Sequence, residues 1–145
     1  MALLALLKHE LVTFGYSKEE YAQILSEFEI EVLRSFNTNG LSDIINVINT
    51  HEKLKYKKDI LLIINNLKII YEILTNVINY SIYDIVTAHL QCIHMLSNVN
   101  LLKMDNEIGD FICDFSNACE GVKVKCSLEI YKQILTFFLK KEFFL

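Results

Sequence analysis

The sequence predicts an all-α fold: a compact single-domain bundle of six or seven helices over residues 1–145, around a buried central antiparallel helix hairpin (about 59–79 and 82–98). Three observations predict it. The chain contains no proline and only four glycines, so few residues interrupt a helix. Its 145 residues are enough to bury a core without disulfides or metals, and hydrophobic residues make up 52% of it, which excludes disorder. Residues 60–78 are apolar on nearly every side, which is typical of a helix with neighbours all round it.

Three helices are expected before the hairpin. In residues 1–14, apolar side chains recur at spacings of three and four, which is typical of an amphipathic helix. Ser17 and Glu20 have the spacing of a capping box, so a second helix should begin there and continue to about Phe36. The stretch 37–40, Asn-Thr-Asn-Gly, should end it, because asparagine and glycine tolerate the left-handed backbone found at helix ends.

The third helix and the start of the hairpin are marked by polar residues. Ser42 or Asp43 can cap a short helix, and a lysine-rich connector at 51–58 follows it. Asp59 is then placed to cap the first helix of the hairpin, because a negative charge is favourable at a helix N-terminus.

The second helix of the hairpin and two later helices also begin at polar caps. Ser81, with Asp84 three residues later, should begin the hairpin's second helix. Asp105 can cap a helix that ends at Gly121, and Ser127 can cap the last one. The four residues after Gly121 alternate like a strand, but they are too few to predict one without an evident partner.

The acidic residues are concentrated in the first third of the chain. The net charge is −4; residues 1–50 carry seven acidic and three basic side chains, and residues 51–145 carry eleven of each. This balance disfavours direct binding of nucleic acid and favours a partner protein with a basic surface. Three glutamates of the second helix fall within about 40° of one another at 3.6 residues per turn. The predicted partner-binding residues are Glu10, Glu19, Glu20, Glu27, Glu31 and Asp43.

No catalytic, cofactor-binding or metal-ligating residue is predicted, and no cofactor is expected. His89 and Cys92 could share a helix face, but His94 is five residues from His89 and is turned away by roughly 140°. Zinc-binding helices use spacings of three or four. A nucleophilic cysteine would need one of these histidines as its base, and nothing in the sequence links them. No Cys-x-x-Cys pair occurs among Cys92, Cys113, Cys119 and Cys126. Because the sequence shows no export signal, we interpret these cysteines as reduced thiols inside a cell.

The segment Met104–Phe111 resembles the short BH3-type helix of death regulators. It has an apolar residue, then after three more residues a second apolar residue, followed by Gly-Asp. It departs from the family's pattern in having Met104 where leucine is usual, and in lying late in the chain. The resemblance implies a viral apoptosis-regulator fold with a buried central helix hairpin and an apolar groove that takes a partner helix.

These observations favour a non-enzymatic protein that binds another protein. Its sharper form is an immunity protein or antitoxin that blocks a basic, nuclease-type toxin with the acidic first third. The alternative is the apoptosis-regulator-like bundle with an apolar groove. The apolar start, residues 1–7, has neither the basic n-region nor the cleavage site of a secretory signal. Lys68 and Glu72 interrupt the longest apolar segment, so we expect a cytoplasmic protein without a membrane span. The oligomeric state is left open.

Overall fold

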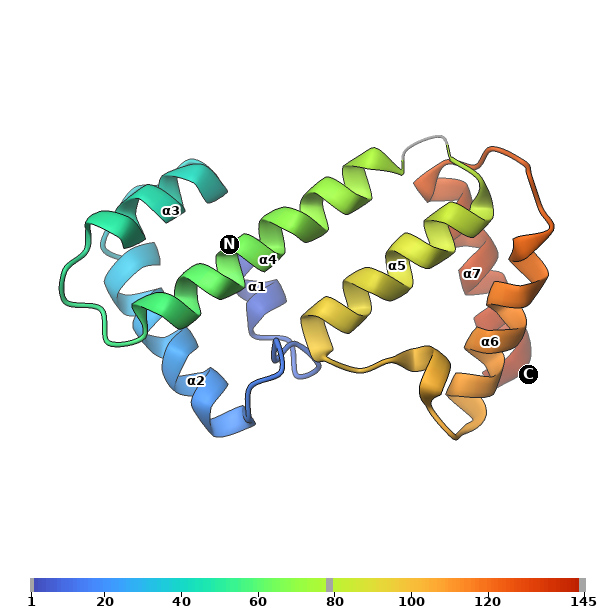
Figure 1. Cartoon of the computed structure of the whole chain (residues 1–145), viewed down its shortest axis with the longest axis horizontal. Helices are drawn as coiled ribbons and strands as arrows, with labels where there is room; N and C mark the ends of the chain where they lie inside the picture. The colour runs from blue at the N-terminus through green and yellow to red at the C-terminus, as the bar shows by residue number, and fades with distance from the viewer. Residues whose placement is uncertain (1, 78–79, 144–145) are drawn as a thin grey trace. The chain divides into compact units, whose positions relative to one another are not determined.

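The computed structural model describes residues 2–77 and 80–143, in which the regular elements are all helices and no strand occurs, and this confirms the all-α prediction. Seven α-helices, one π-helical segment (η1) and one short 3-10 helix (η2) follow one another along the described chain (Figure 1). Their bounds are α1 Ala2–Leu7, α2 Lys18–Glu27, η1 Phe28–Leu33, α3 Leu41–Thr50, α4 Lys57–Asn76, α5 Ile82–Ser97, η2 Leu101–Lys103, α6 Glu107–Glu120 and α7 Leu128–Phe143.

The helices α4 and α5 occur where the two helices of the hairpin are expected. The start of α5 has the predicted cap, Ser81, which bonds reciprocally with Asp84. The amide of Asp84 donates to Ser81 Oγ at 3.2 Å, and the amide of Ser81 donates to Asp84 Oδ2 at 3.3 Å. The predicted turn between the helices includes Asn79, which lies outside the described residues.

The contacts divide the chain into two compact units, which we describe separately. Unit 1 comprises Met1–Tyr71 and Met95–Asn98, and unit 2 comprises Glu72–His94 and Val99–Leu145. Two helices, α4 and α5, therefore contribute residues to both units. The expectation of a single domain over residues 1–145 stays a prediction.

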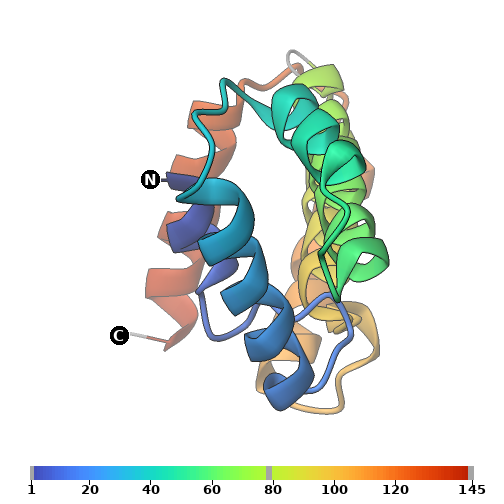
Figure 2. The same cartoon turned by 90° about the vertical axis from the view of Figure 1, so that its left-hand side faces the viewer.

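Unit 1 packs α1, α2, η1 and α3 against the first turns of α4, and α2 and α3 can be followed in Figure 2. The Tyr21 hydroxyl donates to the backbone oxygen of Leu7 at 3.0 Å, which joins α2 to α1. Burial raises the pKa of Tyr21 to about 12. The most deeply buried side chains of this core include Leu7, Val32, Ile48, Ile60 and Ile64.

The outer face of α4 differs from the expectation of burial on nearly every side. Ile60, Ile64 and Leu67 recur at helical spacing and are buried against α1, α2 and α3. Leu62 and Ile69, which are seven residues apart and share another face, are 51% and 44% exposed. The elements of unit 1 thus cover one side of α4.

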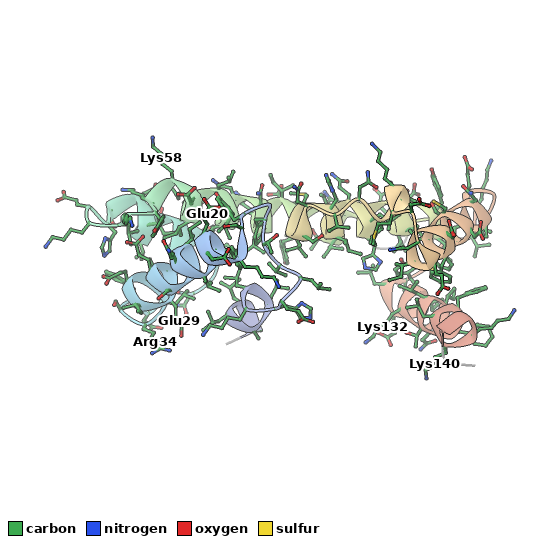
Figure 3. All side chains as sticks on the ribbon, turned by 90° about the horizontal axis from the view of Figure 1, so that it is seen from below. Glu20, Glu29, Arg34, Lys58, Lys132 and Lys140 are labelled. Atoms are coloured by element: carbon green, nitrogen blue, oxygen red, sulfur yellow. The ribbon has the colours of Figure 1, made fainter. Side chains whose placement is uncertain are left out.

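The expected single helix from residue 17 to about residue 36 changes its winding after Glu27. The amide of Arg34 donates to the backbone oxygen of Glu29 at 2.9 Å, a bond over five residues that is characteristic of a π-helix. Glu29 is buried in this segment, and its carboxylate pairs with Lys8 at 2.7 Å and with Arg34. Figure 3 labels Glu29 and Arg34. These hydrogen bonds, first from Lys8 and then from Arg34, hold the pKa of Glu29 below its usual range.

Unit 2 packs α5, α6 and α7 around a second core. Its buried side chains come from all three helices and include Ile85, Val86, Phe115 and Tyr131. His89 Nδ1 lies 2.8 Å from the Tyr131 hydroxyl, so two polar groups satisfy each other beside this core. After Gly121 the described chain forms one isolated bridge, from Ser81 to Lys125, rather than a strand.

The caps of the later helices are partly as expected. Ser127 accepts the amide of Ile130 at 3.2 Å, so it caps α7 as predicted. At α6 the cap is Asn106 rather than Asp105, because the amide of Gly109 donates to Asn106 Oδ1 at 3.0 Å. Asp59 does not cap α4 but accepts the Tyr16 hydroxyl at 2.9 Å.

Candidate functional site

A groove runs along α6 in unit 2 and has a volume of about 730 Å³. This volume is in the range of pockets that bind ligands. All of its lining residues belong to unit 2 and come from α5, α6, α7 and the residue after Gly121. Its apolar lining consists of Ile82, Phe111, Phe115, Ala118, Cys119, Val122, Ile134 and Phe138.

Aromatic rings form much of the floor of this groove. Phe111 and Phe115 are four residues apart on α6, so they lie on one face, with ring centroids 6.0 Å apart and the rings stacked. Phe138 of α7 meets Phe115 edge to face at 5.7 Å. Phe138 is nevertheless 40% exposed, so an apolar surface is left open to a binding partner.

Three exposed carboxylates of α6 also line the groove. Glu107, Asp110 and Asp114 lie at spacings of three and four, which places them along one edge of the helix. Among the side chains that the structure describes, those of residues 2–77 and 80–141, none forms an ion pair or hydrogen bond with any of the three. We call these three residues the acidic rim.

Two of the three lysines of α7 line a different hollow from the groove. Lys132 and Lys140 of α7 line a separate hollow together with Phe137, and Figure 3 labels both lysines. The α7 side chains in the groove are Ile134 and Phe138, which are apolar. Lys132 and Lys140 therefore lie outside the groove, and no ion pair joins Lys141, the third lysine of α7, to the acidic rim.

The folded chain distributes its charge differently from the linear sequence. The range of unit 1 holds nine acidic and eight basic residues, a net charge of −1, because the lysines at 53–58 and Lys68 belong to it. The range of unit 2 holds nine acidic and six basic residues, a net charge of −3. Most of the net negative charge thus belongs to the unit that carries the groove.

Three of the predicted partner-binding residues hold helix ends in unit 1. The carboxylate of Glu20 accepts the Ser17 hydroxyl at 2.9 Å within the predicted capping box. Glu27 accepts the amides of Lys55 and Tyr56, which precede α4, at 2.8 and 2.7 Å.

The third is Asp43, which accepts the amide of Asn39 at 3.0 Å, close to the start of α3. All three carboxylates therefore have a structural role that does not require a partner.

The other three predicted residues, Glu10, Glu19 and Glu31, are exposed in unit 1. Glu31 lies 3.8 Å from His51 Nε2 and, with Glu27, lines an open hollow of about 740 Å³. Lys53 and Lys55 line the same hollow, so its charge is mixed. The assignment of these six residues to partner binding stays a prediction.

The histidines and cysteines considered for chemistry are spread over different environments. His89 contacts Tyr131, Cys92 is buried in α5, and His94 is exposed. Burial raises the pKa of Cys92 and Cys119, which keeps both thiols protonated at neutral pH. Among the described residues, no group of three or more potential ligands is arranged to hold a metal ion.

The segment that resembles a BH3-type helix is not one continuous helix in the structure. Met104 follows the last residue of η2, and α6 begins only at Glu107, so the first three residues of the segment are not helical. Gly109 has a structural role there, since a Cβ atom on it would lie 1.9 Å from the Met104 carbonyl oxygen. Phe111 lines the groove of this protein, so it does not form part of a helix face that could bind in the groove of another protein.

The acidic rim was not among the predicted partner-binding residues. A local signal was available, because residues 104–122 contain five acidic residues and no basic one. Summing the charge over residues 51–145 concealed this, since the lysines at 53–58 balanced it. The apolar floor could not be found in the same way, because its residues come from three helices.

None of the described helices is long and apolar enough to cross a membrane. Comparison of the chain with protein-family models, with curated proteins and with solved structures finds no match.

Proposed function

We propose that this chain is a non-catalytic protein that binds a segment of a partner protein in the groove along α6. The observation that carries the proposal is the apolar lining of this groove, in which Phe138 is 40% exposed and packs on the buried ring of Phe115. Exposed apolar surfaces with a polar border are typical of protein-binding sites. The free thiols of all four cysteines fit a reducing compartment, so we place this function in the cytoplasm.

The groove favours a bound helix over a bound strand. Adding a strand requires an open sheet edge, and residues 2–77 and 80–143 contain no sheet. A helix instead needs an apolar channel flanked by helices, which α5, α6 and α7 provide. This is the binding mode of the alternative hypothesis drawn from the sequence, although the BH3-type segment itself does not support it.

Filling the groove should abolish binding. Ala118 is exposed and lines the groove, so Ala118→Trp would occupy it without removing a core contact. The neighbouring Asn117 is also exposed and does not line the groove, so Asn117→Trp is the matched control. Peptides would be selected from a displayed library of helical sequences against the full chain. Their affinity for the chain and for both variants would then be measured.

We expect the selected peptides to bind the wild-type chain and Asn117→Trp equally, and to bind Ala118→Trp at least tenfold more weakly. Amide resonances of α6 and α7 should shift on titration, because the peptide contacts these helices. A library that yields no binder, or binders that are indifferent to Ala118→Trp, would overturn the proposed function.

The exposed acids of unit 1 support a second candidate, an inhibitor of a basic nuclease-type toxin. Glu10, Glu19 and Glu31 are exposed, as steering of a basic partner requires. Their joint reversal to lysine spares the carboxylates that hold helix ends. If the chain inhibits any of a panel of cationic nucleases, the reversal should slow association and weaken its salt dependence. Inhibition that the reversal leaves unchanged would reject this surface, and so would a panel without any inhibited nuclease.

A further inference from the structure

We propose that the occupant of the groove is an amphipathic helix of a partner protein with lysine or arginine residues along one edge, facing the acidic rim. This inference rests on the proposed function and adds the chemistry of the partner. It follows from the combination of an apolar floor and unpaired carboxylates in one groove.

The dimensions of α6 suit a helical occupant. Its 14 residues span about 21 Å at 1.5 Å per residue, so an aligned partner helix could contact the groove over roughly four turns. The exposed Phe138 and the small exposed Ala118 leave room for apolar side chains of the partner. Those side chains would recur every three or four residues, as on any amphipathic helix.

The acidic rim sets the charge of the partner. Glu107 and Asp114 are seven residues apart, which corresponds to about 10 Å or two helical turns, and Asp110 lies between them. A helix lying alongside α6 can present basic residues with the same spacing. The three carboxylates have no partner among the described residues, so an incoming cation displaces no existing ion pair.

The same carboxylates argue against other ligands. Phosphate groups of nucleic acid would be repelled by the acidic rim, as would an acidic peptide. An uncharged apolar helix would fill the floor but would leave the rim unused. A preference for positively charged over negatively charged ligands therefore distinguishes the proposed basic helix from nucleic acid, an acidic peptide and an uncharged helix.

Two synthetic helical peptides would test the inference with the full chain. Both carry leucines at the same positions along one face, and they differ only at three flanking positions, which are lysine in one peptide and glutamate in the other. Each exposed ion pair should contribute about a factor of two to affinity, and the glutamates are in addition repelled, so the lysine peptide should bind at least about tenfold more tightly than the glutamate peptide. The preference should shrink at high salt, because exposed charges are screened.

The triple variant Glu107→Gln, Asp110→Asn and Asp114→Asn should bring the two affinities close together. Glu120 is exposed on α6 and does not line the groove, so Glu120→Gln is the control and should leave the preference intact. The triple variant keeps the size of each side chain, so the apolar floor is unaltered. Its folding would be checked by circular dichroism.

The outcomes separate the inference from the proposed function. Equal binding of both peptides, lost in Ala118→Trp, overturns the charge assignment and leaves the groove as a binding site. Binding of neither peptide, together with a library that yields no binder, overturns both. Sedimentation that shows self-association abolished by Ala118→Trp would identify a second copy as the occupant and overturn the assignment to a partner protein.

Discussion

Removal of the Glu27 carboxylate should destabilise unit 1 by about 2 kcal/mol, because Glu27 receives the amides of Lys55 and Tyr56 just before α4. Hydrogen bonds to a charged group contribute about 1.5–3 kcal/mol when they are shielded from water. The bond from Tyr56 is partly buried, so we assign it about 1.5 kcal/mol. The bond from Lys55 is exposed, and water can replace it, so we assign it about 0.5 kcal/mol.

The assay is urea denaturation of the full chain, combined with hydrogen exchange of the amides in the first turns of α4. Glu27→Ala should lower the free energy of unfolding by the full 2 kcal/mol or so. Glu27→Gln retains a neutral acceptor and should lose about 1 kcal/mol. Glu31→Ala is the control, because it removes an exposed carboxylate one turn away and should change stability by less than about 0.5 kcal/mol.

The exchange measurement locates the effect. Loss of the Glu27 carboxylate should speed exchange of the Lys55 and Tyr56 amides and of the start of α4, because these groups lose their acceptor. If Glu27→Ala and Glu31→Ala give the same urea midpoint and the same exchange at Tyr56, Glu27 does not stabilise the start of α4 and our reasoning is refuted.

Three further predictions concern the core and its ionisable groups. Gly109→Ala should destabilise unit 2 by at least about 1 kcal/mol, because its Cβ atom would overlap the Met104 carbonyl, whereas Gly121→Ala, with open space around it, should be neutral or slightly stabilising in the same urea assay. The lowered pKa of Glu29 means that its ion pairs stabilise the protein above its ordinary pKa of 4.5 and are lost as the pH falls through the lowered value. Glu29→Gln should therefore lower the free energy of unfolding at neutral pH and make it depend less on pH in acid. An unchanged dependence of the unfolding free energy on pH in acid would contradict this. Burial lowers the pKa of His89, so the unfolded chain takes up a proton near pH 6.5 before the folded chain does, and stability should fall as the pH drops below 6.5. His89→Gln should remove that slope from urea midpoints measured across the range, and a slope that persists would assign it to another group.

The local chemistry of helix ends was predictable from the sequence. Ser17 and Glu20 form the expected capping box, and Ser81 caps α5 as expected, because the residues of each cap lie within one helical turn. Ser127 caps α7 for the same reason. The all-α fold follows from such signals together with the scarcity of chain breakers.

Features that depend on distant residues were not predictable in this way. Glu27 caps a helix that begins about 30 residues later, and a pattern within α2 gives no sign of it. Glu29 is buried because the π-helical winding of η1 and the cation of Lys8 act together. The exposure of Leu62 and Ile69 depends on which side of α4 the other helices occupy.

The candidate site was predictable only in part. The acidic residues of α6 are visible in the sequence, whereas the contact of Phe115 with Phe138 requires the packing of α7 on α6. The negative charge of the first 50 residues is nearly balanced in the folded protein, because the lysines at 53–58 belong to the same unit. Charge belongs to a folded surface rather than to a stretch of sequence.

The boundary between the two units passes through α4 after Tyr71 and through α5 after His94. A gene fragment encoding either unit alone would therefore have to stop inside a helix. Up to four backbone amides or carbonyls would lose their acceptors or donors at each cut. Dissection by truncation is thus ill suited to this protein, and point substitutions in the intact polypeptide are the better way to assign tasks to its two halves.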